Sequence, residues 1–475
     1  MIDMKKSSFL IKYLLFTLIA LSVFSCATYK ELSAKYQHEV LAGEFDVAMK
    51  SIDNNKFLNK DRNELLYCLE KGKVAYLKGD YKLSNELFNK ADLLIEDHKV
   101  NKVGEVLGVL ANPEKTTYKS EDFEKVAIHY YKAMNYIFLN LYDDALVEAK
   151  RINIQLQEIN DSYPAGKKNR YTTDAFALNL QGLLYETTGN LNDAFISYRN
   201  AVELYQQNDG TYFGVNIPQQ LKQDLINAAH QLGFVDEELR YSELFNLKYK
   251  PKSADFKGEL IVFWESGLVP YKSQTYFTFT ALPGNNNGFT SITNEELDLT
   301  FPVPTSNNSN SGKFSSTSIF NIAFPKYEDR IPYFTSGKVV LNNDISKNYQ
   351  LELVEDYKTI AFKTLKDRTV REIGKIAIRV AAKKISENIV RNQNENLGAV
   401  LGILNALNEK TDTRNWQTLP NKIYYTRIPL NKEDNIVKVE VKTNHEETIE
   451  KEFIVKSSGN LNFINYITPQ SENVN

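Results

Sequence analysis

Two stretches of the N-terminal half share one pattern of small, turn and aromatic residues, and this pattern constrains the fold more than any other feature. Each stretch places a small residue before a glycine turn, and aromatic and small residues after it. The residues are Gly72, Gly79-Asp80-Tyr81, Phe88 and Ala91 within 67–97, and Gly182, Gly189-Asn190-Leu191, Ala194, Tyr198 and Ala201 within 178–205. Because glycine adopts a left-handed helix end cheaply, each turn predicts two helices that pack closely against each other.

The repeated pattern resembles the tetratricopeptide (TPR) motif, a helical hairpin of ~34 residues. Weaker copies follow the turn residues Gly43, Asn140 and Gly233, at irregular intervals. We therefore expect a TPR-like helical repeat domain over residues 26–250. Such arrays leave an extended concave face. That face either holds an envelope protein partner or packs on the chain's own C-terminal half, and the sequence leaves both alternatives open.

The composition changes near residues 249–253, and strand-like patterns follow. Residues 260–264 form a short apolar run typical of a buried strand, and residues 274–280 alternate as its expected neighbour. We predict an α+β domain over 255–470, with strands in 258–350, helices in 353–408 and strands in 420–467. The chain is thus expected to be α+β, a TPR-like array followed by a β-rich domain with an inserted long helix pair.

The first inserted helix is basic. Residues 358–391 contain ten basic and three acidic side chains. This excess is compatible with a solvated helix face, with binding to acidic lipid headgroups or other envelope polyanions, or with packing against an acidic partner. The sequence does not decide among these three roles.

The N-terminus predicts export and lipid anchoring. Basic residues precede a 12-residue apolar run at 13–24, which is too short to span a bilayer and typical of a signal peptide over residues 1–25. Residues 23–26 resemble the bacterial lipobox, in which the cysteine after the cleavage site, here Cys26, is diacylated. An uncleaved signal anchor is the alternative. No Asp follows Cys26, which by analogy with sorting rules favours the outer membrane, and no acidic cluster follows either, which favours an orientation facing the periplasm.

Two motifs stand out in the C-terminal half. Residues 265–272 (ESGLVPYK) and 412–420 (DTRNWQTLP) resemble the E-x-G-x-x-P-x-K and D-T-R-x-W-x-x-L-P elements of a family of uncharacterised bacterial lipoproteins. The resemblance covers most of the chain and implies a helical-repeat N-terminal half and an envelope location. Members occur beside lipoprotein activators of cell-wall synthases, which implies a role near cell-wall synthesis. The family supplies no chemistry.

The motif residues have a structural and a functional alternative. Asp412 and Arg414 are expected to pair or to cap the preceding helix, and Glu265 and Lys272 to form a salt bridge across their turn. Trp416 is expected to be buried between the helical insert and the sheet. These residues form either a structural hub or an exposed partner-binding site.

The sequence contains no pattern of catalytic or metal-binding residues. Its five histidines lack a second ligand at metal spacing, and no H-E-x-x-H, G-x-S-x-G or P-loop motif occurs. Cys68 is expected to be a buried hydrophobic residue. With a net charge of -3 there is no reason to expect nucleic-acid binding. We therefore predict no cofactor and no metal. We also predict a membrane-anchored scaffold or assembly factor, with a regulator of cell-wall synthesis or a cell-wall glycan enzyme as alternatives.

Overall fold

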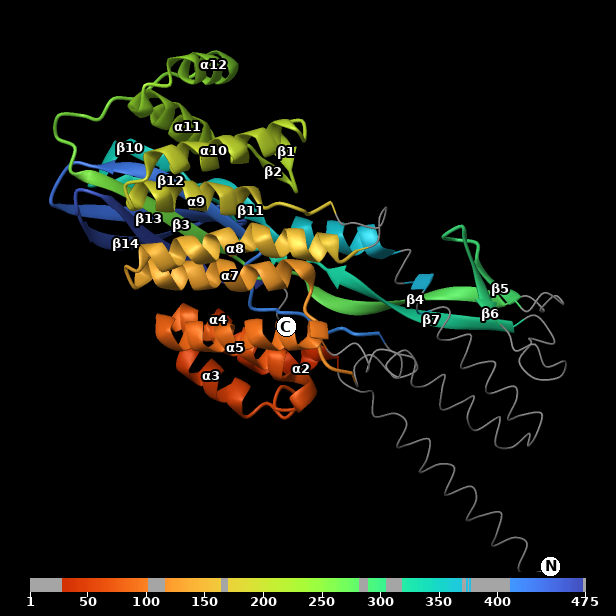
Figure 1. Ribbon diagram of the computed structural model, residues 1–475. Helices are drawn as coiled ribbons and strands as arrows, with labels where there is room; N and C mark the ends of the chain where they lie inside the picture. The colour runs from red at the N-terminus through yellow and green to blue at the C-terminus, as the bar shows by residue number, and fades with distance from the viewer. Residues whose placement is uncertain are drawn as a thin grey trace, which may run out of the picture.

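The computed structural model describes residues 28–100, 116–163, 170–281, 289–304, 318–369, 373–374, 376 and 411–472. Helices dominate the first half of the chain and strands the second, so the predicted α+β class is confirmed (Figure 1). Cys26 and most of the expected helix pair at 353–408 lie outside the described residues. In the described part, no helix is long and apolar enough to cross a membrane.

Ten of the described helices form five consecutive pairs, which confirms the predicted repeat array. Each pair turns at a residue with positive φ, and these residues are Gly43, Gly79, Asn140, Gly189 and Gly233. The pairs are α2 (Tyr29–Leu41) with α3 (Phe45–Asp53), α4 (Glu64–Lys78) with α5 (Tyr81–Val100), α7 (Asp122–Phe138) with α8 (Tyr142–Asp161), α9 (Ala175–Thr187) with α10 (Leu191–Gln206), and α11 (Gln219–Leu232) with α12 (Val235–Phe245).

The small residues inside the first helices allow close packing, as the pattern predicts. A Cβ atom added to Gly72 would lie 2.9 Å from the ring of Phe88, and one added to Gly182 would lie 2.1 Å from the ring of Tyr198. In both pairs the aromatic residue of the second helix therefore occupies the space that a side chain would need. This contact fixes how the two helices of a pair approach each other.

The C-terminal half contains two four-stranded sheets packed face to face, and a third that extends away from them as an arm (Figure 1). The facing sheets have the orders β11-β12-β3-β15 and β10-β9-β13-β14, and the arm sheet has the order β6-β5-β4-β7. The strands are β3 (Gly258–Ser266), β4 (Tyr271–Ala281), β5 (Phe289–Asn294), β6 (Leu299–Pro304), β7 (Ser318–Glu328), β9 (Phe334–Leu341), β10 (Asp344–Gln350), β11 (Glu352–Asp356), β12 (Lys422–Leu430), β13 (Asp434–Thr443), β14 (Thr448–Lys456) and β15 (Leu461–Thr468). Pairs of two-residue strands are β1 (Thr211–Tyr212) with β2 (Val215–Asn216), and β8 (Ile331–Pro332) with β16 (Ser471–Glu472).

Strand β3 is buried on both faces and joins two cores. Leu260, Val262 and Trp264 face the second sheet, where they pack with residues such as Val339 and Val439. The alternate residues of β3 face the helical array: Phe263 lies 6.0 Å from Phe176 of α9, measured between ring centres. The chain therefore forms three layers, with the helices on one face of sheet β11-β12-β3-β15 and the other sheet on the opposite face.

Two sequence expectations about this half are wrong. Strand β4 does not pair with β3, because β3 lies between β12 and β15, whereas β4 pairs with β5 and β7 in the arm sheet. The predicted helix does not begin at 353, because residues 352–356 form strand β11, which pairs with β12. The helical segment begins at residue 357, where Asp356 Oδ1 accepts a hydrogen bond from the Thr359 amide at 2.8 Å.

Candidate functional site

The inner face of the helical array contacts the sheet through a buried set of polar side chains, which we call the polar seam. The first helices of successive pairs, α4 and α7, contribute one side of it. The end of β3, the start of β4 and the segment 411–421 contribute the other. The polar seam comprises Glu70, Lys73, Tyr76, Glu121, Glu124 and Tyr131 of the helical half, and Glu265, Lys272, Asp412, Arg414, Gln417, Thr418 and Asn465 of the C-terminal half.

Glu265 lies at the centre of the polar seam, with 1% of its surface exposed. Its carboxylate accepts hydrogen bonds from Lys73 Nζ at 2.5 Å and from the hydroxyls of Tyr76 at 2.8 Å and Tyr131 at 3.0 Å. The side-chain amide of Asn465 on β15 donates a fourth hydrogen bond at 2.9 Å. Burial lowers the pKa of Lys73 to about 8, even though the charge of Glu265 opposes this shift.

Lys272 does not pair with Glu265, so the expected salt bridge across the turn is wrong. Its ammonium instead pairs with Glu121, at the start of α7, and Arg368 pairs with the same carboxylate. Burial alone would raise the pKa of Glu121, but the charges of Arg368 and Lys272 outweigh that effect and lower it to about 2. Glu121 is therefore ionised at neutral pH.

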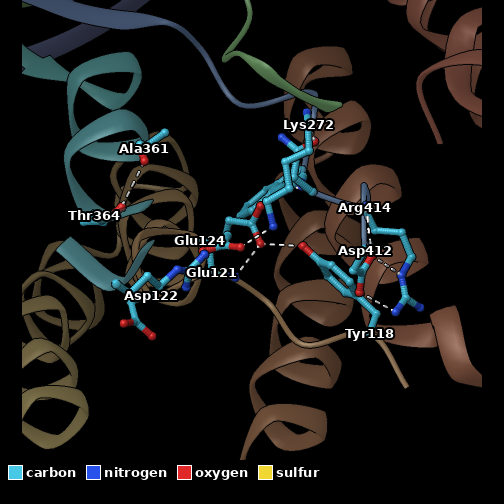
Figure 2. Close-up of polar contacts among 12 residues, drawn as sticks. Tyr118, Glu121, Asp122, Glu124, Lys272, Ala361, Thr364, Asp412 and Arg414 are labelled. Carbon is cyan, nitrogen blue, oxygen red and sulfur yellow. Dashed lines mark hydrogen bonds and ion pairs between the residues drawn. The ribbon is translucent and has the colours of Figure 1, made fainter. Parts of the chain in front are cut away.

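The pKa of Glu124, one helical turn from Glu121, is shifted in the opposite direction. One carboxylate oxygen accepts hydrogen bonds from the Tyr118 hydroxyl at 2.5 Å and the Glu121 amide at 2.8 Å, and the other accepts one from the Trp416 amide at 2.7 Å. Burial, followed by the negative charge of Glu121, raises the pKa of Glu124 to about 7. Figure 2 shows these two carboxylates between Lys272 and Tyr118.

Asp412 and Arg414 form an ion pair, and Arg414 also donates hydrogen bonds to residues of the helical half. Two guanidinium nitrogens of Arg414 donate to the two carboxylate oxygens of Asp412, at 2.8 and 2.6 Å (Figure 2). A third, Nη1, donates to the Asn63 side chain at 2.7 Å and to the Thr116 carbonyl at 3.1 Å. Through these hydrogen bonds Arg414 connects the segment 411–421 to the helical half. It presents little charge to solvent, because it is only 1% exposed.

The ring of Trp416 is fully buried, but its ring neighbours belong to the helical array. It lies 5.5 Å from Phe88 of α5 and 5.9 Å from Tyr131 of α7, measured between ring centres. Gln417 and Thr418, which follow it, both donate to the carboxylate of Glu70, at 2.9 and 2.7 Å. The D-T-R-x-W element therefore belongs to a segment without helix or strand that joins the sheet to α4, α5 and α7.

A second group of charged side chains, of which only Asp224 is fully buried, lies farther along the array. Arg427 of β12 pairs with Glu186, Asp224 and Glu259 at 2.7, 3.1 and 2.6 Å. Burial raises the pKa of Asp224 to about 7, although the charge of Arg427 opposes the shift. With these contacts, each first helix from α4 through α11 bonds to or packs on the sheet side, so the inner face of these pairs is covered by the chain's own C-terminal half.

The seam residues on the helices were not identified from sequence. Glu70 and Lys73 lie four positions after Leu66 and Leu69, on the apolar side of α4, and charged residues at such positions are rarely buried unless they are paired. That anomaly is the signal that could have marked them. Glu121 and Glu124 carry a weaker signal, because acidic residues are common in the first turn of a helix.

The polar seam is arranged for packing and not for contact with a substrate. Glu70, Glu124 and Glu265 are each at most 1% exposed, and all three accept several hydrogen bonds from side chains or backbone of the chain itself. This arrangement favours the structural-hub alternative for Glu265, Lys272, Asp412, Arg414 and Trp416 over exposed partner binding. In the described ranges, no group of three or more His, Cys, Asp or Glu side chains could hold a metal ion. Cys68 is buried, and burial raises the pKa of its thiol to about 11.

Comparison with known proteins finds solved structures that are similar to the helical half of this chain. No family model matches the chain, and no curated protein matches it. Among solved structures, the protein MamA matches at 17% identity over 43% of this chain and 89% of its own, with a TM-score of 0.27. RapI matches at 14% over 46% of this chain and 52% of its own, at 0.33. A Podosopora anserina kinesin light chain with nearly identical TPR-like repeats matches at 13% over 46% and 90%, at 0.29.

Proposed function

We propose that this chain is an envelope lipoprotein, anchored in the outer membrane through Cys26 and facing the periplasm, that acts as a non-catalytic interaction scaffold or assembly factor. The lipobox-like residues 23–26 support the anchor. The first described helix begins close behind them, because α2 starts at Tyr29.

One observation supports a scaffold over an enzyme most directly: the titratable groups of the polar seam are buried and join the helices to the sheet. A hydrolase needs an acid and a base that reach a substrate. In the polar seam the ionised Glu121 and the raised-pKa Glu124 form such a pair chemically, but both are buried against Lys272, Tyr118 and the Trp416 backbone. The polar seam therefore holds the helical half and the C-terminal half together as one folded unit.

This arrangement changes where a partner can bind. From the sequence we expect an envelope protein partner on the TPR-like face, which is the inner face of the array. From α4 through α11, the chain's own sheet covers that face. A partner therefore has to use the outer surfaces. Exposed apolar side chains at well-separated places on those surfaces include Leu93 on α5, Leu239 on α12 and Ile319 on β7, at 67%, 56% and 72% exposure.

The scaffold proposal is tested by photo-crosslinking in intact cells. A photoreactive amino acid is placed singly at 93, 239 and 319, and the lipoprotein is isolated under denaturing conditions. A scaffold gives a defined adduct with another envelope protein from at least one position. The enzyme alternative is tested in parallel by incubating the protein with purified cell wall. No adduct at any position, together with release of glycan fragments, would reverse the assignment.

The anchor is tested separately by metabolic labelling with an alkyne fatty acid. We expect Cys26→Ser to abolish the label and to release the protein from membranes. Cys68→Ser is the matched control, because Cys68 is buried in α4 and should leave the label unchanged. A label that persists on Cys26→Ser contradicts the proposed anchor.

A further inference from the structure

The first described helix is fixed to the body from its first residue. The Tyr29 side chain is 1% exposed, its hydroxyl lies 2.7 Å from that of Tyr36, and it donates to the Glu70 carboxylate at 2.9 Å. Thr28, just before it, is held by the helix start: its amide donates to the Glu31 carboxylate at 2.8 Å, and its carbonyl accepts from the Leu32 amide. The backbone is therefore held in place by hydrogen bonds from Thr28 onward.

Only Ala27 and Thr28 separate Tyr29 from Cys26. Three residue steps of even fully extended chain span at most ~11 Å. The polar headgroup region on each side of a bilayer is itself on the order of 5–8 Å thick. A body attached through acyl chains on Cys26 can therefore lie at most a few ångströms beyond the headgroups.

We infer that the face around the start of α2 lies directly on the lipid headgroups, so that the bilayer surface is a binding partner of this face and fixes the orientation of the whole body. This inference rests on the proposed acylation of Cys26. The face consists of the start of α2, the loop 54–60 and the start of β4. The loop belongs to it because the Asn55 side chain donates to the Leu32 carbonyl at 2.9 Å and the Phe57 ring lies 5.7 Å from that of Tyr29.

The side chains of this face suit a headgroup layer. The ammonium of Lys30 lies 4.3 Å from the ring centre of Tyr271 at the start of β4, and that of Lys60 lies 5.7 Å from the ring centre of Phe57. Lys56, in the same loop, is exposed. Lysines beside aromatic rings are favoured at membrane interfaces, where the stem packs on apolar surface and the ammonium reaches phosphate. The acidic Glu31 and Asp61 offset part of this charge, so the acyl chains supply the affinity and the face determines the orientation.

The orientation has a consequence for the array. Figure 1 shows α2 and α12 at opposite ends of the row of helical pairs. With α2 on the bilayer, the array stands on its first pair, and α12 is the part of the array farthest from the membrane.

The inference is tested with the full lipidated protein in vesicles that contain lipids with a nitroxide on the headgroup. A fluorescent thiol label is attached at Lys60→Cys, and in a matched control at Asp236→Cys on α12, both of which are exposed positions. The native Cys68 is buried with a raised pKa and should stay unlabelled under native conditions. We expect several-fold stronger quenching at position 60 than at 236.

A second variant isolates the role of the short connection. Ten Gly and Ser residues inserted between Ala27 and Thr28 add ~17 Å of average reach. They should reduce the quenching at position 60 towards the value at 236, while flotation with vesicles is unchanged. Equal quenching at the two positions, or no effect of the insertion, overturns the inference alone. A protein that carries no acyl group and does not float overturns the proposed anchor, and the inference with it.

Discussion

The carboxylate of Glu265 and the ammonium of Lys73 lie 2.5 Å apart, and their side chains are 1% and 2% exposed. Glu265 lies near the end of strand β3, whereas Lys73 is on the second pair of helices. Removing one partner of a buried ion pair leaves an uncompensated charge, at a cost of about 3–5 kcal/mol. This contact is therefore expected to be among the strongest single links between the two halves.

The first prediction follows from that pair. Glu265→Ala should lower the free energy of unfolding by about 3–5 kcal/mol, because the Lys73 charge is left buried. The matched control on the same helix is Lys71→Ala, whose partner Asp53 is 45% exposed, and it should cost no more than about 1 kcal/mol. Urea denaturation measures both. Equal costs for the two variants would mean that the Glu265–Lys73 pair is not an important link.

The second prediction concerns pH. The folded protein keeps a proton on Glu124 up to about pH 7, whereas an unfolded glutamate releases it near 4.5. Folding therefore takes up a proton between these values, and the stabilising contribution of this group is present below pH 4.5 and is lost as the pH rises through 7. Denaturation curves across this window should show the loss in the wild type, and a weaker pH dependence in Glu124→Gln. Parallel pH profiles for the two proteins would contradict the raised pKa of Glu124.

The third prediction compares two residues of the D-T-R-x-W element. Trp416→Ala removes a fully buried ring and should cost about 3–5 kcal/mol. Arg414→Ala leaves the Asn63 side chain and the Thr116 carbonyl without their donor, and should cost less, about 1–3 kcal/mol. Thermal melts of the form that lacks residues 1–26 give the order. Two wild-type-like melts would instead make this element the first place to look for a binding role.

The fourth prediction concerns the packing glycines. An alanine at Gly182 would place its Cβ 2.1 Å from the Tyr198 ring, whereas one at Gly72 would be 2.9 Å from the Phe88 ring. Overpacking typically costs about 1–3 kcal/mol, and Gly182→Ala should be at the upper end of that range or above it. Gly72→Ala should cost less, because a smaller shift of the ring relieves the contact. The reverse order of melting temperatures would contradict this description of the helical pairs.

The helical pairs were predictable because their signals are local. A turn glycine, together with a small residue inside the helix that the glycine ends, specifies two helices and their close approach. No contact with the rest of the chain is needed for this signal. Both strong copies and the weaker ones at Gly43, Asn140 and Gly233 correspond to observed turns. The same holds for the β13–β14 hairpin, whose strands are adjacent in sequence and pair regularly.

The seam was not predictable, because its contacts depend on topology. Glu265 and Lys272 are seven positions apart, but Gly267 turns the chain with φ +65, and β4 leaves for the arm sheet. Glu265 then meets Lys73 of α4 and Tyr131 within α7, whereas Lys272 meets Glu121 at the start of α7. The error at 353–356 has a related cause. Five residues are too few to show strand alternation, and their strand state depends on pairing with β12, which follows much later in the chain.

We expect the helical array and the sheet to unfold as one cooperative body. Both tryptophans belong to the C-terminal half: Trp264 is in β3, and Trp416 packs on Phe88 and Tyr131 of the array, whereas most described helix lies in the N-terminal half. Denaturant unfolding can therefore be followed by tryptophan fluorescence in the sheet and at its contact with the array, and by helical circular dichroism in the array. We predict one transition with the same midpoint by both probes. Two separate transitions, with helix retained after the tryptophan signal has changed, would contradict the claim.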